Sequence, residues 1–342
     1  MKVDGGVGGL DLAPFAAKKA EDEGYDGVWT AETGHDPFFP LLLAAEHTER
    51  IELGTGIAVA FARSPMNLAA VANDLQLYSK GRFILGLGSQ IKAHIEKRFS
   101  MPWSHPAPRM REFIMAMRAT WDSWHNGTKL DFRGDFYSHT LMTPFFSPGP
   151  SEYGAPKVFL AAVGALMTEV AAEAGDGLLC HAFTTERYLR EVTLPAIDKG
   201  LATAGKTRAD FQISGPGFIV TGSDEKEFAQ AASAIRQQIA FYGSTPAYRP
   251  VLELHGWGDL QTELNGLSKQ GEWVQMGTLI TDEILDTFAV VAEKPEDVPA
   301  KLIGRYGDCI DRIAFYAPYR SKDPELFQRM ISELKDAPAP TR

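Results

Sequence analysis

Short apolar runs alternate with amphipathic segments along most of the chain. The runs are continuously apolar or alternate with a period of two, which is typical of strands buried in a sheet. We predict strands at residues 1–4, 27–31, 51–60, 81–90, 157–162, 176–181, 211–220 and 309–316. Between the runs, apolar residues recur at helical spacing. Eight strand and helix alternations in one chain predict an α/β fold, the (β/α)8 TIM barrel.

The helical segments have recognisable ends. The pattern predicts helices at residues 11–24, 38–48, 64–78, 110–126, 166–174, 185–204, 223–242, 295–306 and 324–334. Asp11 is the expected N-cap of the first helix, and Gly24 is its expected stop. We expect residues 91–108 to be irregular and residues 132–137 to form a hairpin arm.

The region before the last strand contains more helix than one barrel repeat requires. Residues 247–288 are largely helical in pattern. We therefore expect a helical insertion region at about 221–292, inside a single TIM-barrel domain of residues 1–335. The Pro-rich residues 336–342 are expected to be a disordered tail.

Composition narrows the class of function. The 342 residues are 44% hydrophobic and 23% charged, as in an ordinary globular protein, and the formal net charge is −10. A negative chain without a Lys/Arg run is not expected to bind nucleic acid. No apolar stretch approaches a membrane span or a signal core, and Cys180 and Cys309 lie in apolar runs as expected of buried free thiols. We expect a cytoplasmic enzyme that acts on a small-molecule substrate.

Glycines mark the ends of two neighbouring predicted strands. Gly54 and Gly56 end the third strand, and Gly86 and Gly88 end the fourth. Because glycine has no side chain, a ligand can approach the backbone there, but small residues also line crowded barrel interiors. Both interpretations stay open for Gly54 and Gly86, which lie deeper in their strands. Neither strand carries a dinucleotide fingerprint, and the chain contains no Walker A loop.

These glycines belong to an ordered series of motifs. The series is Gly24-Tyr25-Asp26-Gly27-Val28-Trp29-Thr30-Ala31-Glu32, Leu53-Gly54-Thr55-Gly56-Ile57 with Ser64-Pro65, Gly81-Arg82-Phe83-Ile84-Leu85-Gly86-Leu87-Gly88, and Ala174-Gly175-Asp176-Gly177. In this order the motifs resemble the luciferase-like monooxygenase superfamily, in particular its branch that uses the deazaflavin coenzyme F420. The resemblance runs over nearly the whole chain. It implies a barrel of the luciferase-like type, and a homodimer by analogy with other members.

Two residues after the second strand are the candidate catalytic groups. In TIM barrels the active site lies at the carboxyl ends of the strands, where Glu32 ends its strand. The family has an acidic residue here that is commonly followed by histidine, whereas Thr33 follows in this chain. His35 is close enough to supply a proton instead. The alternatives are that Glu32 is a cap or surface residue and that His35 only shapes the loop.

Residues at four other strand ends are candidates for binding the cofactor. The resemblance implies a non-prolyl cis peptide between Gly56 and Ile57, behind the deazaflavin ring. Backbone N–H groups at a helix start can bind phosphate, although an ordinary helix start has the same pattern. The expected cofactor-binding residues are Gly56, Ile57, Gly88, Ser89, Gln90, Val163, Gly164, Ala165, His181 and Thr184.

Other chemistries find little support in the sequence. The eight histidines form no His-Glu-x-x-His or similar metal-binding set, and no G-x-S-x-G elbow is present. Four further polar residues are candidates for the substrate or the coenzyme tail, but are more simply structural or on the surface: Arg63, Asn67, His94 and His255.

The resemblance implies an oxidoreductase that transfers a hydride between F420 and a small organic substrate. Three alternatives remain at this stage. The first is a luciferase-like monooxygenase that uses FMN supplied by a reductase. The second is a noncatalytic protein that binds F420 or a flavin, and the third is an unrelated barrel enzyme.

Overall fold

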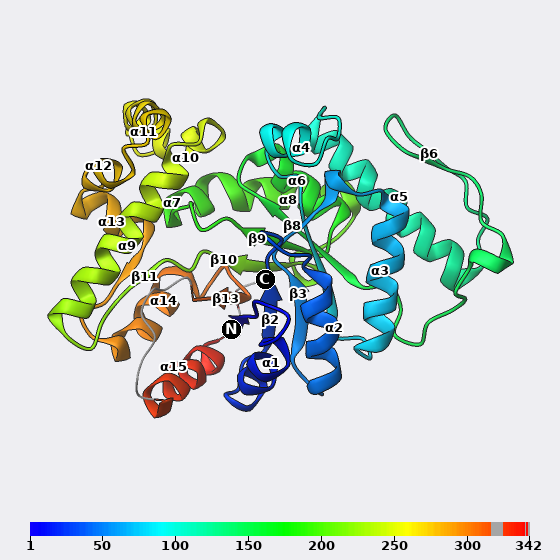
Figure 1. The fold of residues 1–342 in the computed structure, drawn as a ribbon, viewed down its shortest axis with the longest axis horizontal. Helices are drawn as coiled ribbons and strands as arrows, with labels where there is room; N and C mark the ends of the chain where they lie inside the picture. Colours follow the sequence, from blue (N-terminus) through cyan, green and yellow to red (C-terminus); the bar gives the residue numbers. More distant parts are fainter. Residues whose placement is uncertain (316–323, 339, 341–342) are drawn as a thin grey trace.

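The centre of the molecule is a closed barrel of eight parallel strands. The computed structural model describes residues 1–315, 324–338 and 340. The barrel strands are β1 (Lys2–Gly6), β2 (Gly27–Thr30), β3 (Glu52–Thr55), β5 (Phe83–Gly88), β8 (Lys157–Ala162), β9 (Gly177–Cys180), β10 (Gln212–Gly215) and β13 (Arg312–Ala314). They pair in the order β3-β2-β1-β13-β10-β9-β8-β5, and the pairing of β3 with β5 closes the ring. The predicted TIM barrel is confirmed (Figure 1).

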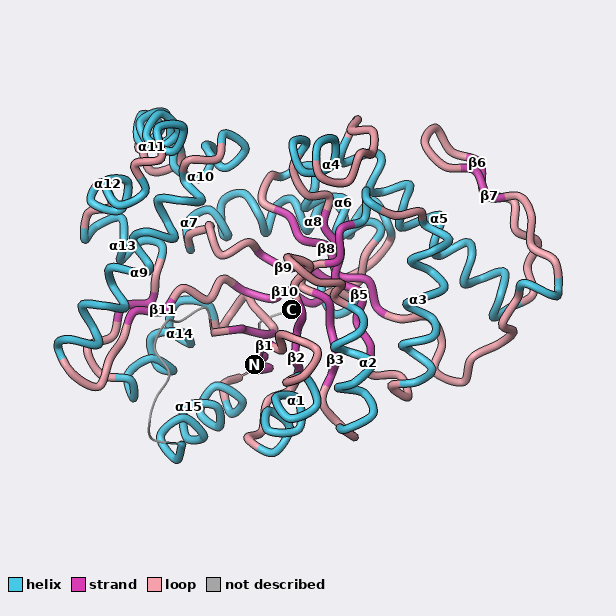
Figure 2. The backbone as a smooth tube through the Cα atoms, viewed as in Figure 1, coloured by secondary structure: helices cyan, strands magenta, loops and turns pink. Residues whose placement is uncertain are grey.

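Helices surround the strands on the outside of the barrel, as Figure 2 shows by colour. They are α1 (Ala13–Asp22), α2 (Phe38–His47), α3 (Pro65–Tyr78), α4 (Lys92–Lys97), α5 (Pro106–Asn126), α6 (Ala165–Ala174), α7 (Glu186–Tyr188), α8 (Leu194–Ala204), α14 (Val298–Tyr306) and α15 (Pro324–Asp336). The apolar stripe of α5 is buried, and its Trp121 Nε1 donates to the Ala69 carbonyl at 3.0 Å. This bond ties α5 to α3.

The interior of the barrel is filled by charged and aromatic side chains as well as by apolar ones. Arg312 and Asp4 are buried and form a bidentate ion pair, with both N–O distances at 2.7 Å. The guanidinium also lies over the Trp29 ring, 5.2 Å from its centroid, and Trp29 hydrogen-bonds to Asp4. A Cβ on Gly27 would lie 2.6 Å from an Asp4 oxygen, so the ion pair occupies the space that this glycine leaves.

A second group of helices follows β10 and extends to one side of the barrel (Figure 1). It comprises α9 (Glu225–Gly243), α10 (Arg249–Glu253), α11 (Gly258–Gln270), α12 (Trp273–Thr278) and α13 (Asp282–Phe288). These helices contribute most of a second hydrophobic cluster, which is distinct from the cluster between the strands and the outer helices. Their position between β10 and β13 agrees with an insertion into one repeat; the single-domain division itself stays a prediction.

The structure differs from the sequence predictions at several element ends. The predicted strand at 211–220 is two strands, because β11 (Ile219–Val220) leaves the barrel and pairs with β12 (Val290–Val291). Asp11 does not cap the first helix, whose N-cap is Leu12 and has no side-chain cap. The region 91–108 was predicted to be irregular but contains the short helix α4 and the start of α5.

The hairpin arm and the chain end complete the fold. The arm predicted at 132–137 is present as the antiparallel strands β6 (Phe132–Arg133) and β7 (Ser138–His139). Residue 316, at the end of the predicted eighth strand, lies outside the described residues. Much of the predicted tail does too, namely 339 and 341–342, while α15 extends to Asp336.

Candidate active site

A backbone bulge follows β3 at the carboxyl edge of the barrel. The Gly56–Ile57 peptide bond is cis, which confirms the expectation from the resemblance. Gly56 N–H donates to the Thr30 carbonyl at 2.6 Å, and Glu32 N–H donates to the Ile57 carbonyl at 3.2 Å. The last residue of β2 and the loop after it therefore hold the bulge from both of its ends. Beyond it, β4 (Ala58–Val59) pairs again with β5.

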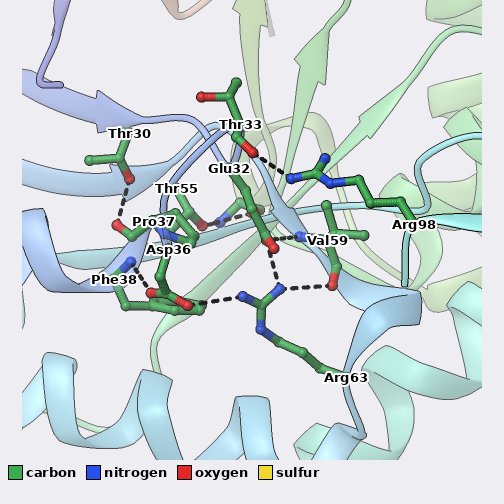
Figure 3. Close-up of polar contacts among 11 residues, drawn as sticks. Thr30, Glu32, Thr33, Asp36, Pro37, Phe38, Thr55, Val59, Arg63 and Arg98 are labelled. Atoms are coloured by element: carbon green, nitrogen blue, oxygen red, sulfur yellow. Dashed lines mark hydrogen bonds and ion pairs between the residues drawn. The ribbon is translucent and has the colours of Figure 1, made fainter. Parts of the chain in front are cut away.

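The Glu32 side chain binds the far side of the same bulge. Its Oε2 accepts from Val59 N–H at 2.7 Å and from Arg63 Nη1 at 2.6 Å (Figure 3). The Glu32 side chain is only 7% exposed, whereas Arg63 is 21% exposed. Charge-assisted bonds of this kind are stronger than neutral ones and fix both partners. Glu32 therefore acts here as an acceptor that anchors the bulge.

Arg63 also connects the bulge to the start of α2. Its Nη2 lies 3.1 Å from an Asp36 oxygen, and the other Asp36 oxygen accepts from Phe38 N–H at 2.9 Å. On the opposite side, Arg98 donates to the Thr33 carbonyl. Figure 3 shows these contacts converging on the loop that carries Glu32.

His35 lies in the same loop but outside this network. Its side chain is exposed. Among the residues that the structure describes, it has no hydrogen-bond or ion-pair partner. The two candidate catalytic residues thus share a loop but differ in environment, since Glu32 is mostly buried and ion-paired whereas His35 is exposed.

The four strand-end glycines make room for different groups. A Cβ on Gly86 would lie 1.7 Å from the Thr55 carbonyl oxygen, and one on Gly54 would lie 2.3 Å from the Trp29 ring. These two glycines allow close packing inside the barrel. A Cβ on Gly88 would lie 2.7 Å from Ile57 Cδ1, so Gly88 accommodates the bulge, whereas a Cβ on Gly56 would meet nothing closer than 3.7 Å.

Ser89 and Gln90 end β5 in a turn of their own. Gln90 has a positive φ of 60°, and its side-chain oxygen accepts from Ile91 N–H at 3.1 Å. Ser89 Oγ donates to the Gln90 carbonyl at 3.1 Å. Both side chains therefore satisfy local backbone groups, and their role in cofactor binding stays a prediction.

The first turn of α6 is open. Gly164 is the N-cap, no side chain caps the helix, and a Cβ on Gly164 would have no neighbour within 4 Å. Val163 and Ala165 flank it and are partly exposed. The first N–H groups of a helix have no acceptor within the helix, and its dipole favours an anion there. This arrangement suits a phosphate.

His181 and Thr184 follow β9 and border the second hydrophobic cluster. The His181 ring contacts the Tyr242 and Tyr248 rings, with centroids 4.5 and 4.7 Å away. Burial lowers the pKa of His181 to about 4. Thr184 is buried, and its neighbour Thr185 caps α7 and lies 2.8 Å from His255 Nε2. His255, a polar candidate from the sequence, thus has a structural contact.

Sequence reasoning missed Trp29 as part of the site and underrated Arg63. Trp29 is partly exposed although it lies in a barrel strand, and it packs beneath Gly54 and near Gly56. The sequence feature that could have identified Trp29 is the alternation of side chains in β2, which places Gly27 and Trp29 on the face that points into the barrel. Arg63 gave no local signal, because its carboxylate partners precede it by about one helix and strand.

The best-defined cavity among the described residues lies away from this edge of the barrel. It measures about 570 Å³, lies between α9, α13 and α14, and is lined by both acidic and basic residues. Within the described ranges no group of three or more histidine, cysteine or acidic side chains could hold a metal ion. No described helix is both long and apolar enough to cross a membrane.

Comparisons with known proteins agree with this architecture. The family model described as luciferase-like monooxygenase matches residues 7–312. An uncharacterised protein of Mycobacterium tuberculosis is 58% identical over 315 residues, which cover 92% of each chain. A 5,10-methylenetetrahydromethanopterin reductase of Archaeoglobus fulgidus is 30% identical over 83% of this chain and 82% of its own.

Two further proteins carry F420 in their names. An F420-dependent glucose-6-phosphate dehydrogenase of Intrasporangium calvum is 30% identical over 56% of this chain and 60% of its own. The solved coenzyme F420 dependent tetrahydromethanopterin reductase of Methanopyrus kandleri has a TM-score of 0.76 at 19% identity, covering 98% of this chain and 97% of that one. Members of the F420 branch are thus among the proteins that this chain resembles. On the match of the family model, the chain belongs to the luciferase-like monooxygenase family.

Proposed function

We propose that this chain is an oxidoreductase that transfers a hydride between coenzyme F420 and a small organic substrate. The observation that carries the proposal is that two features suited to one cofactor lie on the same edge of the barrel. These are the bulge at Gly56 and Ile57, and the open first turn of α6 at Gly164. Similarity to proteins named for F420 supports this choice of cofactor over FMN.

The residues at this edge fit such a group. Gly164 leaves open the position that any side chain would partly fill, and the uncapped N–H groups beside it can donate to a phosphate. At Gly88 the missing side chain leaves room for Ile57 of the bulge, and a Cβ on Gly56 would meet nothing closer than 3.7 Å. Bound F420 would supply the hydride donor or acceptor, and the protein would supply position and proton handling.

Each named residue then has a distinct role. Glu32 and Arg63 hold the bulge in place, so the face on which a planar ring would rest cannot shift. Trp29 supports the bulge from inside the barrel, backed by the ion pair of Asp4 and Arg312. Holding reacting groups in fixed geometry is most of what hydride transfer requires of a protein.

His35 is the proposed proton carrier. It is exposed at the same edge, and an imidazole can both donate and accept a hydrogen bond. Glu32, in contrast, is committed to two donors through one oxygen and serves as the anchor of the loop that carries His35. The proposal therefore separates positioning from proton transfer, although both residues come from the loop after β2.

The test places a carboxylate in the open turn of α6. Gly164→Asp should weaken binding of oxidised F420 at least roughly tenfold, because the new charge repels a phosphate and caps the helix. Gly304→Asp is the matched control, since Gly304 lies in α14 and a Cβ added there would have no neighbour within 4 Å. Binding is measured by calorimetry. Equal affinities of the two variants for F420 would contradict the assignment of the phosphate site.

Turnover is tested separately under anaerobic conditions. Oxidised F420 and a panel of simple alcohols are mixed with the protein, and loss of the F420 absorbance reports hydride transfer. Turnover that requires oxygen and FMN would contradict the proposal and assign the chain to the flavin monooxygenases. Tight F420 binding without turnover on any alcohol or on the reverse reaction with ketones would instead favour a noncatalytic binding protein.

A further inference from the structure

The end of β9 carries a histidine enclosed by aromatic residues from the insertion region. His181 follows β9 directly, and Tyr242 and Tyr248 pack against its ring with centroids 4.5 and 4.7 Å away. Tyr242 lies in the last turn of α9, and Tyr248 lies just before α10. The insertion helices thus reach the carboxyl edge of the barrel at this point.

One ring nitrogen of His181 is committed to the backbone. Phe183 N–H donates to His181 Nδ1 at 3.0 Å. A backbone amide can only donate, so Nδ1 must be the unprotonated nitrogen of a neutral imidazole. The proton therefore resides on Nε2, which is left as a donor.

The second nitrogen and the neighbouring hydroxyl remain available. Among the described residues, the buried side-chain polar atoms without a partner are His139 Nε2 and Thr221 Oγ1. His181 Nε2 and Tyr248 Oη have no hydrogen-bond partner among those residues either, and they are not sealed from solvent. Both side chains are only partly exposed. The two rings that carry these donors are in contact, with centroids 4.7 Å apart.

Neither donor carries a charge. Burial lowers the pKa of His181 to about 4 and raises the pKa of Tyr248 above its ordinary value. A neutral imidazole and a phenol cannot offset the charge of a phosphate in the way that a cation or a helix N-terminus does. They are suited to an uncharged oxygen acceptor, whose transfer into an aromatic surrounding costs less.

The same cluster reaches the neighbouring strand end. Val163, which precedes the open turn of α6, packs against the hydrophobic cluster that also holds Tyr242 and Tyr248. Val163 and Tyr248 therefore border the same cluster, and His181 follows β9, which pairs with β8 next to it in the barrel.

We propose that His181 Nε2–H and the Tyr248 hydroxyl bind the carbonyl or hydroxyl oxygen of an uncharged organic substrate. This inference rests on the proposed function, and it moves His181 from the expected cofactor-binding residues to the substrate. It also gives the insertion region a role, because Tyr248 belongs to it and contributes one of the two donors. His181 binds and orients the oxygen here; it does not act as the proton donor, because a neutral imidazole that gave up its Nε2 proton would be left as an imidazolate anion.

The first part of the test reads the tautomer directly. Long-range ¹H–¹⁵N spectra of histidine-labelled protein should show His181, assigned by its loss in His181→Phe, as the Nε2–H form at neutral pH. Cyclohexanone, methylcyclohexane and inorganic phosphate are then titrated, with and without saturating oxidised F420. Cyclohexanone alone should shift the His181 signals, because of these three probes it is the uncharged oxygen acceptor.

The second part uses matched variants. His181→Phe and Tyr248→Phe should each weaken cyclohexanone binding roughly 2- to 10-fold, the range expected for one neutral hydrogen bond. His139→Phe, in the β6–β7 arm, should leave it unchanged. F420 affinity should stay at the wild-type value in His181→Phe, provided that circular dichroism shows an intact fold.

The outcomes separate this inference from the proposed function. An Nδ1–H tautomer, a shift with phosphate in place of cyclohexanone, or no shift with any probe would overturn the inference. Loss of F420 affinity in a folded His181→Phe would return His181 to the cofactor and overturn it as well. If the wild-type protein binds cyclohexanone at His181 but binds no F420, only the proposed function fails.

Discussion

Removing the guanidinium of Arg63 should destabilise the protein and loosen the bulge after β3. Arg63→Met keeps the apolar stem but removes the ion pairs to Glu32 and Asp36, at 2.6 and 3.1 Å, and the bond to the Val59 carbonyl. Glu32 would then keep only one donor although its side chain is 7% exposed. Glu32 would then be a mostly buried carboxylate without a positively charged partner.

The expected cost follows from that burial. Breaking a fully buried ion pair costs about 3–5 kcal/mol, but Arg63 is 21% exposed, so solvent screens part of the interaction. We expect a loss of about 2–3 kcal/mol in the free energy of unfolding. Glu32→Gln keeps an acceptor for Val59 N–H and should cost less. F420 affinity should fall roughly tenfold in Arg63→Met, because the bulge loses its anchor.

Urea unfolding followed by circular dichroism measures the stability, and calorimetry measures the affinity. The control is Arg133→Met, which breaks the exposed pair of Arg133 and Asp131 on the hairpin arm and should cost less than about 1 kcal/mol. If Arg63→Met unfolds within about 0.5 kcal/mol of the wild type, the network does not hold the bulge, and the reasoning is refuted.

Three further changes probe other parts of the account. Gly88→Ala places a Cβ 2.7 Å from Ile57 Cδ1, so the shifted bulge should lower F420 affinity several-fold in calorimetry; an unchanged affinity would separate the bulge from the cofactor. His181 has its pKa lowered from 6.5 to about 4, so the unfolded state binds its proton first as pH falls. Neutral His181 therefore contributes at most about 3 kcal/mol to the free energy of unfolding, and this contribution is lost as the pH falls from 6.5 to about 4. In His181→Asn, the free energy of unfolding measured in urea should fall less steeply with decreasing pH across this range. Arg312→Met leaves Asp4 buried without its counter-charge and should cost about 3–5 kcal/mol, with partial recovery in the Asp4→Asn/Arg312→Met double variant. Equal stabilities of the single and double variants would argue against a coupled pair.

Apolar periodicity predicted the fold well because each barrel strand is buried on both faces. The strand at Lys157–Ala162 was predicted to the residue. The same signal failed at 211–220, where burial continues through β10 and β11 although the hydrogen-bond partner changes from β9 and β13 to β12. An apolar pattern reports burial but does not report which strand is the partner.

The strand-end rule predicted residues that the structure brings to one edge of the barrel, and their roles in binding or catalysis stay predictions. Glu32 was predicted to be a catalytic group, which stays a prediction, and the sequence did not predict its ion pair with Arg63, a partner that only the closed barrel brings near. Trp29 was missed because a tryptophan in a strand usually signals packing. The room for its ring depends on Gly54, which comes from the neighbouring strand.

The most direct test of the central claim is a parallel titration of the protein with oxidised F420 and FMN, followed by tryptophan fluorescence. Trp29 lies beneath the proposed ring site, so cofactor binding should quench its emission, and Trp29→Phe should lose much of the change. The account predicts saturable quenching by F420 and none by FMN beyond light absorption. Saturable binding of FMN without binding of F420 would contradict it and assign the chain to the flavin-dependent members of its family.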